Sequence, residues 1–208
     1  MRNCHRSAIA VLLLTAACVR APLPVDGGRA PSPVAAPAVL ARSASEWLAL
    51  PEPEYLRARL LVVPVRGVAP ERIPDTFLAA RGTRVHRATD IMAPQGTPVI
   101  AVDAGRVVRL RSNGIGGITL YLEDSAGRMV YYYAHLDRYR DGLVEGARVT
   151  QGELVGYVGV TGNAPRNTPH LHFQAMRRPA DSKWWTGEPI DVRPYLVTGP
   201  TETLAQQP

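Results

Sequence analysis

Cysteine is scarce in this sequence of 208 residues, and both copies, Cys4 and Cys18, lie near the N-terminus. Neither can crosslink a domain that begins far downstream. The sequence also lacks a cysteine cluster of the kind that holds structural zinc. Any transition metal would therefore have to be bound by histidine and carboxylate side chains.

Lysine is scarcer still, because Lys183 is the only lysine among 24 basic residues. The formal net charge is +6, and no run of basic residues occurs. Without a basic run, nucleic-acid binding is a weak interpretation, and we expect no nucleic-acid partner. A mild positive charge is compatible with an anionic polymer such as a cell wall, or with a membrane surface.

The apolar run at residues 8–17 is too short to span a bilayer as a helix. It follows Arg2 and Arg6, so residues 1–17 are expected to form a secretory signal. The small residues before Cys18 resemble the end of a bacterial lipoprotein signal, with Cys18 as the lipidated first mature residue and membrane anchor. Ordinary secretion after Ala17 is the alternative. Both interpretations predict an exported protein of the cell envelope that faces the periplasm or the cell wall.

Alanine and proline dominate residues 18–44, which lack aromatic side chains and periodicity, so we expect a semi-stiff linker there. A folded domain is expected over residues 45–197, followed by a tail at 198–208. At its start, Ser45 is a candidate cap for a short helix, Pro51 and Pro53 should break that helix, and residues 60–65 should form a strand that enters the core.

Short β-strands separated by Gly, Asp and Asn turns dominate the sequence from Thr97 onward. This spacing predicts a mostly β fold, an antiparallel β-sandwich or open barrel with few short helices. The expected strands are residues 98–102, 106–111, 118–123, 129–135, 154–160 and 171–177.

The stretch from His170 to Phe173 places two histidines two positions apart. Alternate side chains of a strand face the same way, so His170 and His172 should share a face while Leu171 and Phe173 face the core. One interpretation of this pair is a metal-binding or catalytic site at the edge of the strand. The other is that one imidazole is hydrogen-bonded within the protein and the other is solvated.

Two further motifs contain the remaining histidines downstream of His5: His86 stands four residues before Asp90, and His135 ends an expected strand. Taken singly, the first fits a surface hydrogen-bonded pair and the second fits a strand cap. Catalytic zinc, however, uses three protein ligands and leaves one position to water. His86, Asp90 and one or both of the paired histidines could supply that set, and spacing alone does not count the ligands.

Three motifs follow one another along the chain: His86-x-x-x-Asp90, Tyr133-Ala134-His135-Leu136 and Pro169-His170-Leu171-His172-Phe173. In this order they resemble the lysostaphin-type (LytM domain) zinc metallopeptidases, which have the "duplicated hybrid motif" fold. The connecting segments 91–99 and 149–159 agree with the same family, and the resemblance covers residues 75–196. One departure is Ala88, which stands where the family usually has glycine.

The resemblance implies that His86, Asp90 and His172 bind Zn2+ and that His135 and His170 form a catalytic pair beside it. The implied reaction is zinc-dependent hydrolysis of peptide cross-links in bacterial peptidoglycan. Which cross-link is cut stays open. The alternative is a non-catalytic LytM-type module that binds cell wall or activates an amidase, which the retention of the whole residue set disfavours.

Three further residues are candidates for lining the substrate groove. Tyr133 should share a strand face with His135, although ordinary core packing fits it equally well. Asn163 and Thr168 lie in a loop that we expect to form one wall of the groove.

Overall fold

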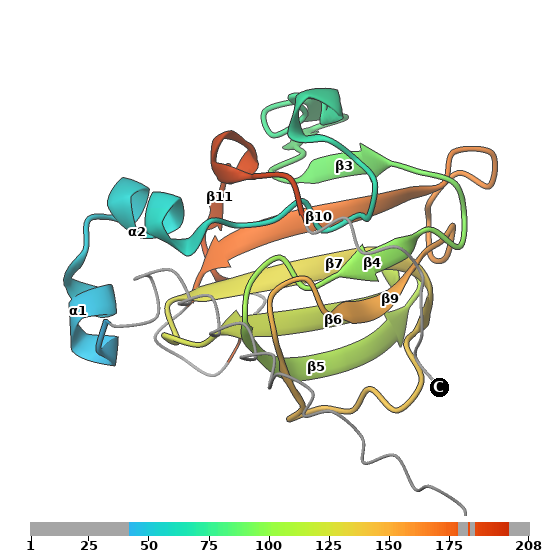
Figure 1. The fold of residues 1–208 in the computed structure, drawn as a ribbon. Helices are drawn as coiled ribbons and strands as arrows, with labels where there is room; N and C mark the ends of the chain where they lie inside the picture. The colour runs from blue at the N-terminus through green and yellow to red at the C-terminus, as the bar shows by residue number, and fades with distance from the viewer. Residues whose placement is uncertain (1–41, 179–182, 184–185, 200–208) are drawn as a thin grey trace, which may run out of the picture. The chain divides into compact units, whose positions relative to one another are not determined.

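The computed structural model describes residues 42–178, 183 and 186–199, and this part forms a curled antiparallel sheet with two short helices at its N-terminal end (Figure 1). The expectations for residues 1–17, for Cys18, for nearly all of the linker and for the end of the tail lie outside the described residues. None of the helices in the described ranges is both long and apolar enough to cross a membrane. The helices are α1 (Ala44–Ala49), α2 (Glu52–Arg59) and the 3₁₀ turns η2 (Pro70–Arg72) and η4 (Arg193–Tyr195).

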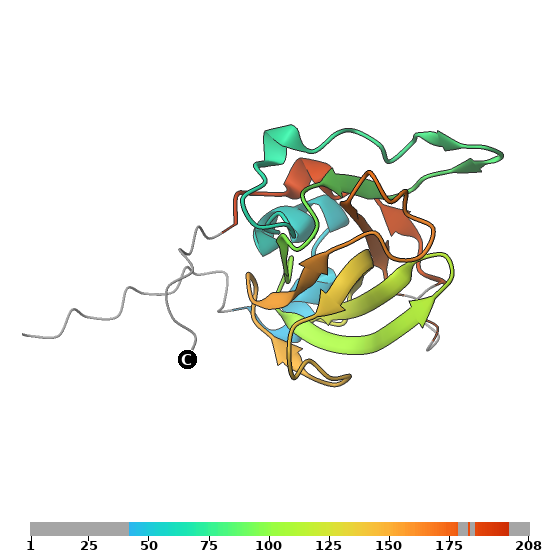
Figure 2. The ribbon, with the colours of Figure 1, turned by 90° about the vertical axis from the view of Figure 1, so that its right-hand side faces the viewer.

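The main sheet has nine strands, and a separate hairpin is formed by β1 and β2. Figure 2 shows this hairpin extending away from the sheet. The strands are β1 (Ala80–Arg81), β2 (Arg84–Val85), β3 (Thr89–Met92), β4 (Pro98–Ile100), β5 (Gly105–Asn113), β6 (Gly117–Asp124), β7 (Met129–Tyr139), β8 (Arg148–Val149), β9 (Leu154–Val158), β10 (His170–Arg177) and β11 (Pro189–Ile190). The expected mostly β, open architecture is confirmed.

The segment before the sheet differs from the expectation in three details. Ser43, not Ser45, caps α1, and it forms a capping box with Glu46. Pro51 lies between α1 and α2, so the expected break occurs there, but Pro53 lies inside the first turn of α2, where a missing backbone N–H costs nothing. Leu60 ends α2 in the left-handed conformation, and residues 61–65 are buried, yet they make only single bridges, Val62 to Val197 and Val65 to Val99, instead of a strand.

Strand β10 positions the site because it pairs on both edges near its start. On one edge His172 lies opposite Asp90 of β3, and on the other it lies opposite Ala134 of β7. The side chains of Leu171 and Phe173 point the other way and are 0% and 1% exposed. Burial of these apolar side chains fixes the register, because a slip by one residue would turn the histidines into the core.

A β-bulge interrupts β7 where it passes the site. The register with β6 shifts between the pairs Ile118–Leu136 and Leu120–Tyr133, and His135 has φ of 60°. A bulge places consecutive side chains on one face. Ala134 and His135 therefore both line the pocket described below, whereas Tyr133 and Leu136 are 0% exposed in the core.

Candidate active site

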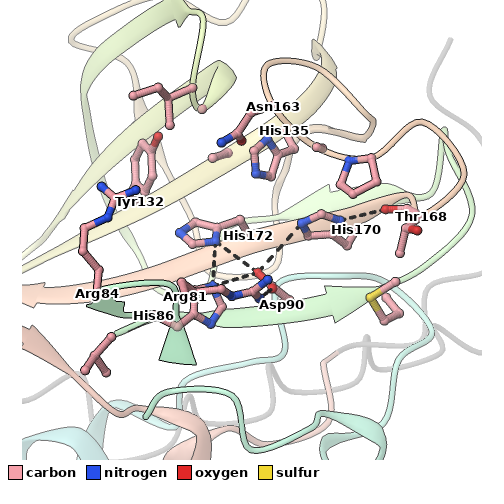
Figure 3. Close-up of a pocket in the computed structure, with 17 residues that line it drawn as sticks. Arg81, Arg84, His86, Asp90, Tyr132, His135, Asn163, Thr168, His170 and His172 are labelled. Atoms are coloured by element: carbon pink, nitrogen blue, oxygen red, sulfur yellow. Dashed lines mark hydrogen bonds and ion pairs between the residues drawn. The ribbon is translucent and has the colours of Figure 1, made fainter. Parts of the chain in front are cut away.

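A pocket of about 630 Å³ opens over β3, β10 and the bulge of β7. Figure 3 shows the side chains that line it, with the imidazoles clustered between Arg84 and Tyr132 at one end and Thr168 at the other. Every histidine downstream of His5 lies in this pocket: His86, His135, His170 and His172. The motifs, which are distant in sequence, thus meet in one place.

Three side chains converge on one point. Oδ1 of Asp90 lies 3.0 Å from Nδ1 of His172 and 3.2 Å from Nε2 of His86, and the two nitrogens are 3.1 Å apart. Zinc bound tetrahedrally at about 2.0–2.1 Å separates its ligand atoms by roughly 3.3 Å. The triangle therefore has the dimensions that a zinc ion requires, and its donor set of two imidazoles and one carboxylate suits zinc.

The tautomer of His86 is fixed by a backbone carbonyl. Its Nδ1 lies 3.0 Å from the oxygen of Thr76, which can only accept, so Nδ1 donates and Nε2 keeps its lone pair. A second partner of this kind is typical of metal-binding histidines. The hydroxyl of Thr76 also accepts a bond from the backbone N–H of Asp90 and donates one to Ala88, so one residue orients the segment that holds two of the three candidate ligands.

The two carboxylate oxygens of Asp90 have different partners. Its Oδ2 accepts a hydrogen bond from Arg81, while Oδ1 faces the histidines. Burial pushes its pKa upward, but the hydrogen bond with His172 and the nearby imidazoles outweigh burial and lower the pKa to about 2. The carboxylate is therefore ionised, and Arg81 holds it in one orientation.

His135 and His170 lie beside the triangle with their ring centroids 5.0 Å apart. Nδ1 of His135 donates to the oxygen of Thr161 at 2.8 Å, and Nδ1 of His170 donates to the oxygen of Thr168 at 2.8 Å. Whenever either ring is neutral, its free lone pair is therefore on Nε2. In His170 this atom lies 3.8 Å from Oδ1 of Asp90. Burial lowers the pKa of His135 and of His86, which favours neutral rings.

Of the three residues expected to line the substrate groove, two line the pocket and one does not. Asn163 and Thr168 line the pocket, as the loop position indicated. The expectation for Tyr133 is corrected: its ring packs on Phe173, and its hydroxyl accepts a hydrogen bond from the backbone of Val102 in the core. The bulge explains the difference, because it breaks the alternation that would have put Tyr133 and His135 on one face.

Tyr132 lines the pocket instead and was missed by sequence reasoning. Its ring meets His172 edge to face, with centroids 6.1 Å apart. Arg81 and Arg84 were missed as well, because the hairpin that carries them has strands of two residues, too short for any periodic pattern. The departure at Ala88 is also explained: the positive φ falls on Arg87, at 53°, and not on Ala88.

Two imidazoles and a carboxylate around an open position, with further histidines alongside, are the features of a mononuclear metal-dependent hydrolase. The sequence matches the description "Peptidase family M23" over residues 84–191. The chain belongs to this family, and the lysostaphin-type resemblance is confirmed.

Similar proteins agree with this assignment. The chain is 32% identical over 120 residues to the L-Ala–D-Glu endopeptidase of Bacillus subtilis, a match covering 55% of this chain and 35% of that protein. It is 38% identical over 94 residues to the peptidoglycan DD-endopeptidase ShyC of Vibrio cholerae, which covers 45% of this chain and 20% of that protein. The chain thus spans about a third or less of the length of these curated relatives.

The fold is shared with a solved structure, the antimicrobial peptidase lysostaphin from Staphylococcus simulans. The TM-score is 0.53 at 24% identity, and the alignment covers 66% of this chain and 53% of that one. At this identity the likeness concerns the fold alone.

Proposed function

We propose that this chain is a zinc-dependent endopeptidase that hydrolyses peptide cross-links of bacterial peptidoglycan. The observation that carries the proposal is the triangle of His86, Asp90 and His172, whose atoms lie 3.0–3.2 Å apart at the floor of an open pocket. Membership of peptidase family M23 and relatives named as endopeptidases support the reaction class.

In this proposal His86 (Nε2), Asp90 (Oδ1) and His172 (Nδ1) hold the metal. When bound, zinc would supply Lewis-acid polarisation of the scissile carbonyl and of the attacking water. Arg81 and Thr76 keep the carboxylate and the His86 ring in place, so that the ligand atoms need no reorganisation.

His135 and His170 are the proposed proton carriers. Each ring is anchored through Nδ1 to a backbone carbonyl, which leaves Nε2 to accept a proton from water and later give it to the departing amine. After protonation, either ring can also donate a hydrogen bond to the oxyanion of the tetrahedral intermediate. The two rings stand on neighbouring strands, β7 and β10, which pair directly. This pairing keeps their separation fixed.

The location of the activity is part of the same proposal. Residues 1–17 would be an export signal, Cys18 the lipidated anchor, residues 18–44 a tether and residues 45–197 the peptidase domain. Such an arrangement would hold the pocket in the cell envelope, within reach of a polymeric substrate.

Digestion of intact peptidoglycan sacculi tests the activity. The purified protein, with zinc, should remove cross-linked dimers from the released muropeptides and create new amino termini. The His170→Ala variant is the matched control, because it alters one proton carrier and leaves the proposed ligands in place. Unchanged cross-links over a range of pH would overturn the proposal. Faster release of peptides from the glycan by an added amidase, without loss of cross-links, would favour the activator alternative.

A further inference from the structure

The β1–β2 hairpin places two arginines directly opposite each other. Arg81 pairs with Arg84 in the register of the hairpin, and both line the pocket. Residues opposite each other in an antiparallel pair have side chains on the same face, and like charges there destabilise the pairing. The two arginines therefore destabilise the hairpin unless a negative charge lies close to them.

Only Arg81 receives such compensation within the described part of the chain. It reaches Oδ2 of Asp90. No hydrogen bond or ion pair of the Arg84 side chain is found among the described residues, and this side chain is exposed. Among the residues that line the pocket, Asp90 is the one carboxylate, and its two oxygens are already taken by Arg81 and the histidine triangle.

The hairpin is not a freely placed arm. Its two ends are joined by hydrogen bonds from the backbone N–H of His86 to Ala79 and from that of Arg87 to Phe77. The Arg81–Asp90 ion pair adds a tie near its turn. Because Arg84 shares a face with Arg81, these ties hold its guanidinium on the pocket side.

Tyr132 supplies a second polar group at the same end of the pocket, as Figure 3 shows. Its hydroxyl lies against Gly116, where an added Cβ would come within 2.2 Å of it. No hydrogen bond of this hydroxyl is found among the described residues. An unpartnered O–H donor and an unpartnered guanidinium thus lie at the end of the pocket farthest from Thr168.

We propose that Arg84, together with the hydroxyl of Tyr132, forms a subsite for a carboxylate of the substrate peptide, on a residue that flanks the cleaved bond. A guanidinium and a hydroxyl are the donors that a carboxylate prefers, and the Arg84 end lies beside His172, next to the proposed reaction centre. The inference rests on the proposed function for the nature of the peptide, and it makes this chain selective for acidic stem peptides over neutral ones.

Binding of two matched peptides tests the subsite. One is a peptidoglycan stem peptide with a free carboxylate beside the bond in question, and the other carries the carboxamide at that atom. Dissociation constants are measured by calorimetry on the zinc-loaded full chain in a His170→Ala background, so that turnover does not consume the peptides. The carboxylate peptide should bind about fivefold tighter, the order expected for a solvent-accessible charged pair.

Arg84→Gln should bring that ratio to about one without weakening the carboxamide peptide, and Tyr132→Phe should reduce it by about twofold. Arg148→Gln is the matched control, since it removes the same charge from an exposed strand position outside the pocket. An unchanged ratio in Arg84→Gln, or an equal loss in Arg148→Gln, would overturn the subsite. The ratio depends on binding alone, so a protein that discriminates the peptides yet leaves sacculi intact would refute the proposed function and keep the subsite.

Discussion

The histidine cluster (His86, Asp90, His135, His170 and His172) and a second polar cluster near the N-terminal helices use similar chemical groups but pair them differently. The second, the N-terminal polar cluster, consists of Tyr55, Arg59, Asp103, Asp124 and Tyr131. Arg59 of α2 forms two hydrogen bonds with Asp103, at 2.6 Å and 2.8 Å, and Tyr131 adds a third. Tyr55 donates to Asp124.

In the N-terminal polar cluster each charge has a protein partner. The side chains of Arg59 and Asp103 are 8% and 3% exposed, and the backbone N–H of Ala104 also donates to Asp103. In the histidine cluster, by contrast, Nε2 of His86, Nδ1 of His172 and Oδ1 of Asp90 lie 3.0–3.2 Å from one another, with the proton of the His172–Asp90 hydrogen bond shared among them. Acceptor atoms at such distances repel unless a cation or a proton lies between them. One cluster is therefore complete within the chain, whereas in the other the proposed zinc would take the place of the shared proton.

The largest effect should come from separating metal binding from proton transfer within the histidine cluster. His172→Ala should lose zinc and activity together, because it removes a proposed ligand. His170→Ala should keep zinc and lower turnover by about 100- to 10,000-fold, the range for a general acid or base. Metal content by mass spectrometry and cleavage of cross-linked muropeptides measure the two properties. A His170→Ala protein without zinc would refute the ligand assignment.

A substitution in the N-terminal polar cluster should lower stability and leave zinc content and turnover unchanged. Asp103→Ala leaves the guanidinium of Arg59 buried without its partner, which should lower the free energy of unfolding by about 3–5 kcal/mol. Zinc content and turnover of the folded fraction should stay close to the original values. Urea denaturation followed by tryptophan fluorescence measures the change.

A control for that experiment is Glu188→Ala, which removes an exposed partner of Arg177 and should change the free energy of unfolding by less than about 1 kcal/mol. The double variant Arg59→Met with Asp103→Ala should recover part of the loss, because it removes the unpaired charge. A loss of activity in Asp103→Ala beyond the unfolded fraction would show that the two clusters are coupled.

Much of the histidine cluster was predictable because its residues lie in short motifs with fixed spacing. The shared face of His170 and His172 and the burial of Leu171 and Phe173 follow from strand alternation. The main strands from β4 to β10 were found for the same reason, apart from the two-residue β8. The N-terminal polar cluster was not predicted, because its pairs join residues 44 and 69 positions apart, and no local pattern reports such contacts.

The errors have local causes as well. Tyr133 was placed on the wrong face because sequence alternation does not reveal a bulge with φ of 60° at His135. The pocket residues Arg81, Arg84 and Tyr132 carry no motif. Their roles depend on where a two-residue hairpin and one strand face come to lie, which only the assembled sheet determines.

The smallest effect expected is at Thr161, which holds His135 without touching the proposed metal position. Its carbonyl accepts from Nδ1 of His135, and its hydroxyl donates to Leu136 at 2.7 Å and accepts from the N–H of Ile118 at 2.9 Å. Thr161→Val keeps the shape of the side chain but removes the hydroxyl, so the carbonyl of Leu136 and the N–H of Ile118 both lose this hydrogen-bond partner. The carbonyl of residue 161 should then lose its fixed position, and kcat should fall about tenfold with KM and zinc content unchanged, a loss of about 1.4 kcal/mol in transition-state stabilisation.

Thr161→Ser distinguishes positioning from general loosening of the fold. It keeps the hydroxyl and removes only the methyl group, so it should restore kcat, whereas any loss of stability from reduced packing should persist. If serine and valine lower kcat equally, the hydroxyl does not hold His135. The bulge of β7, with the bond from the N–H of His135 to Gly116, would then position the ring by itself, and the histidine cluster would be as self-contained on this side as the N-terminal polar cluster is.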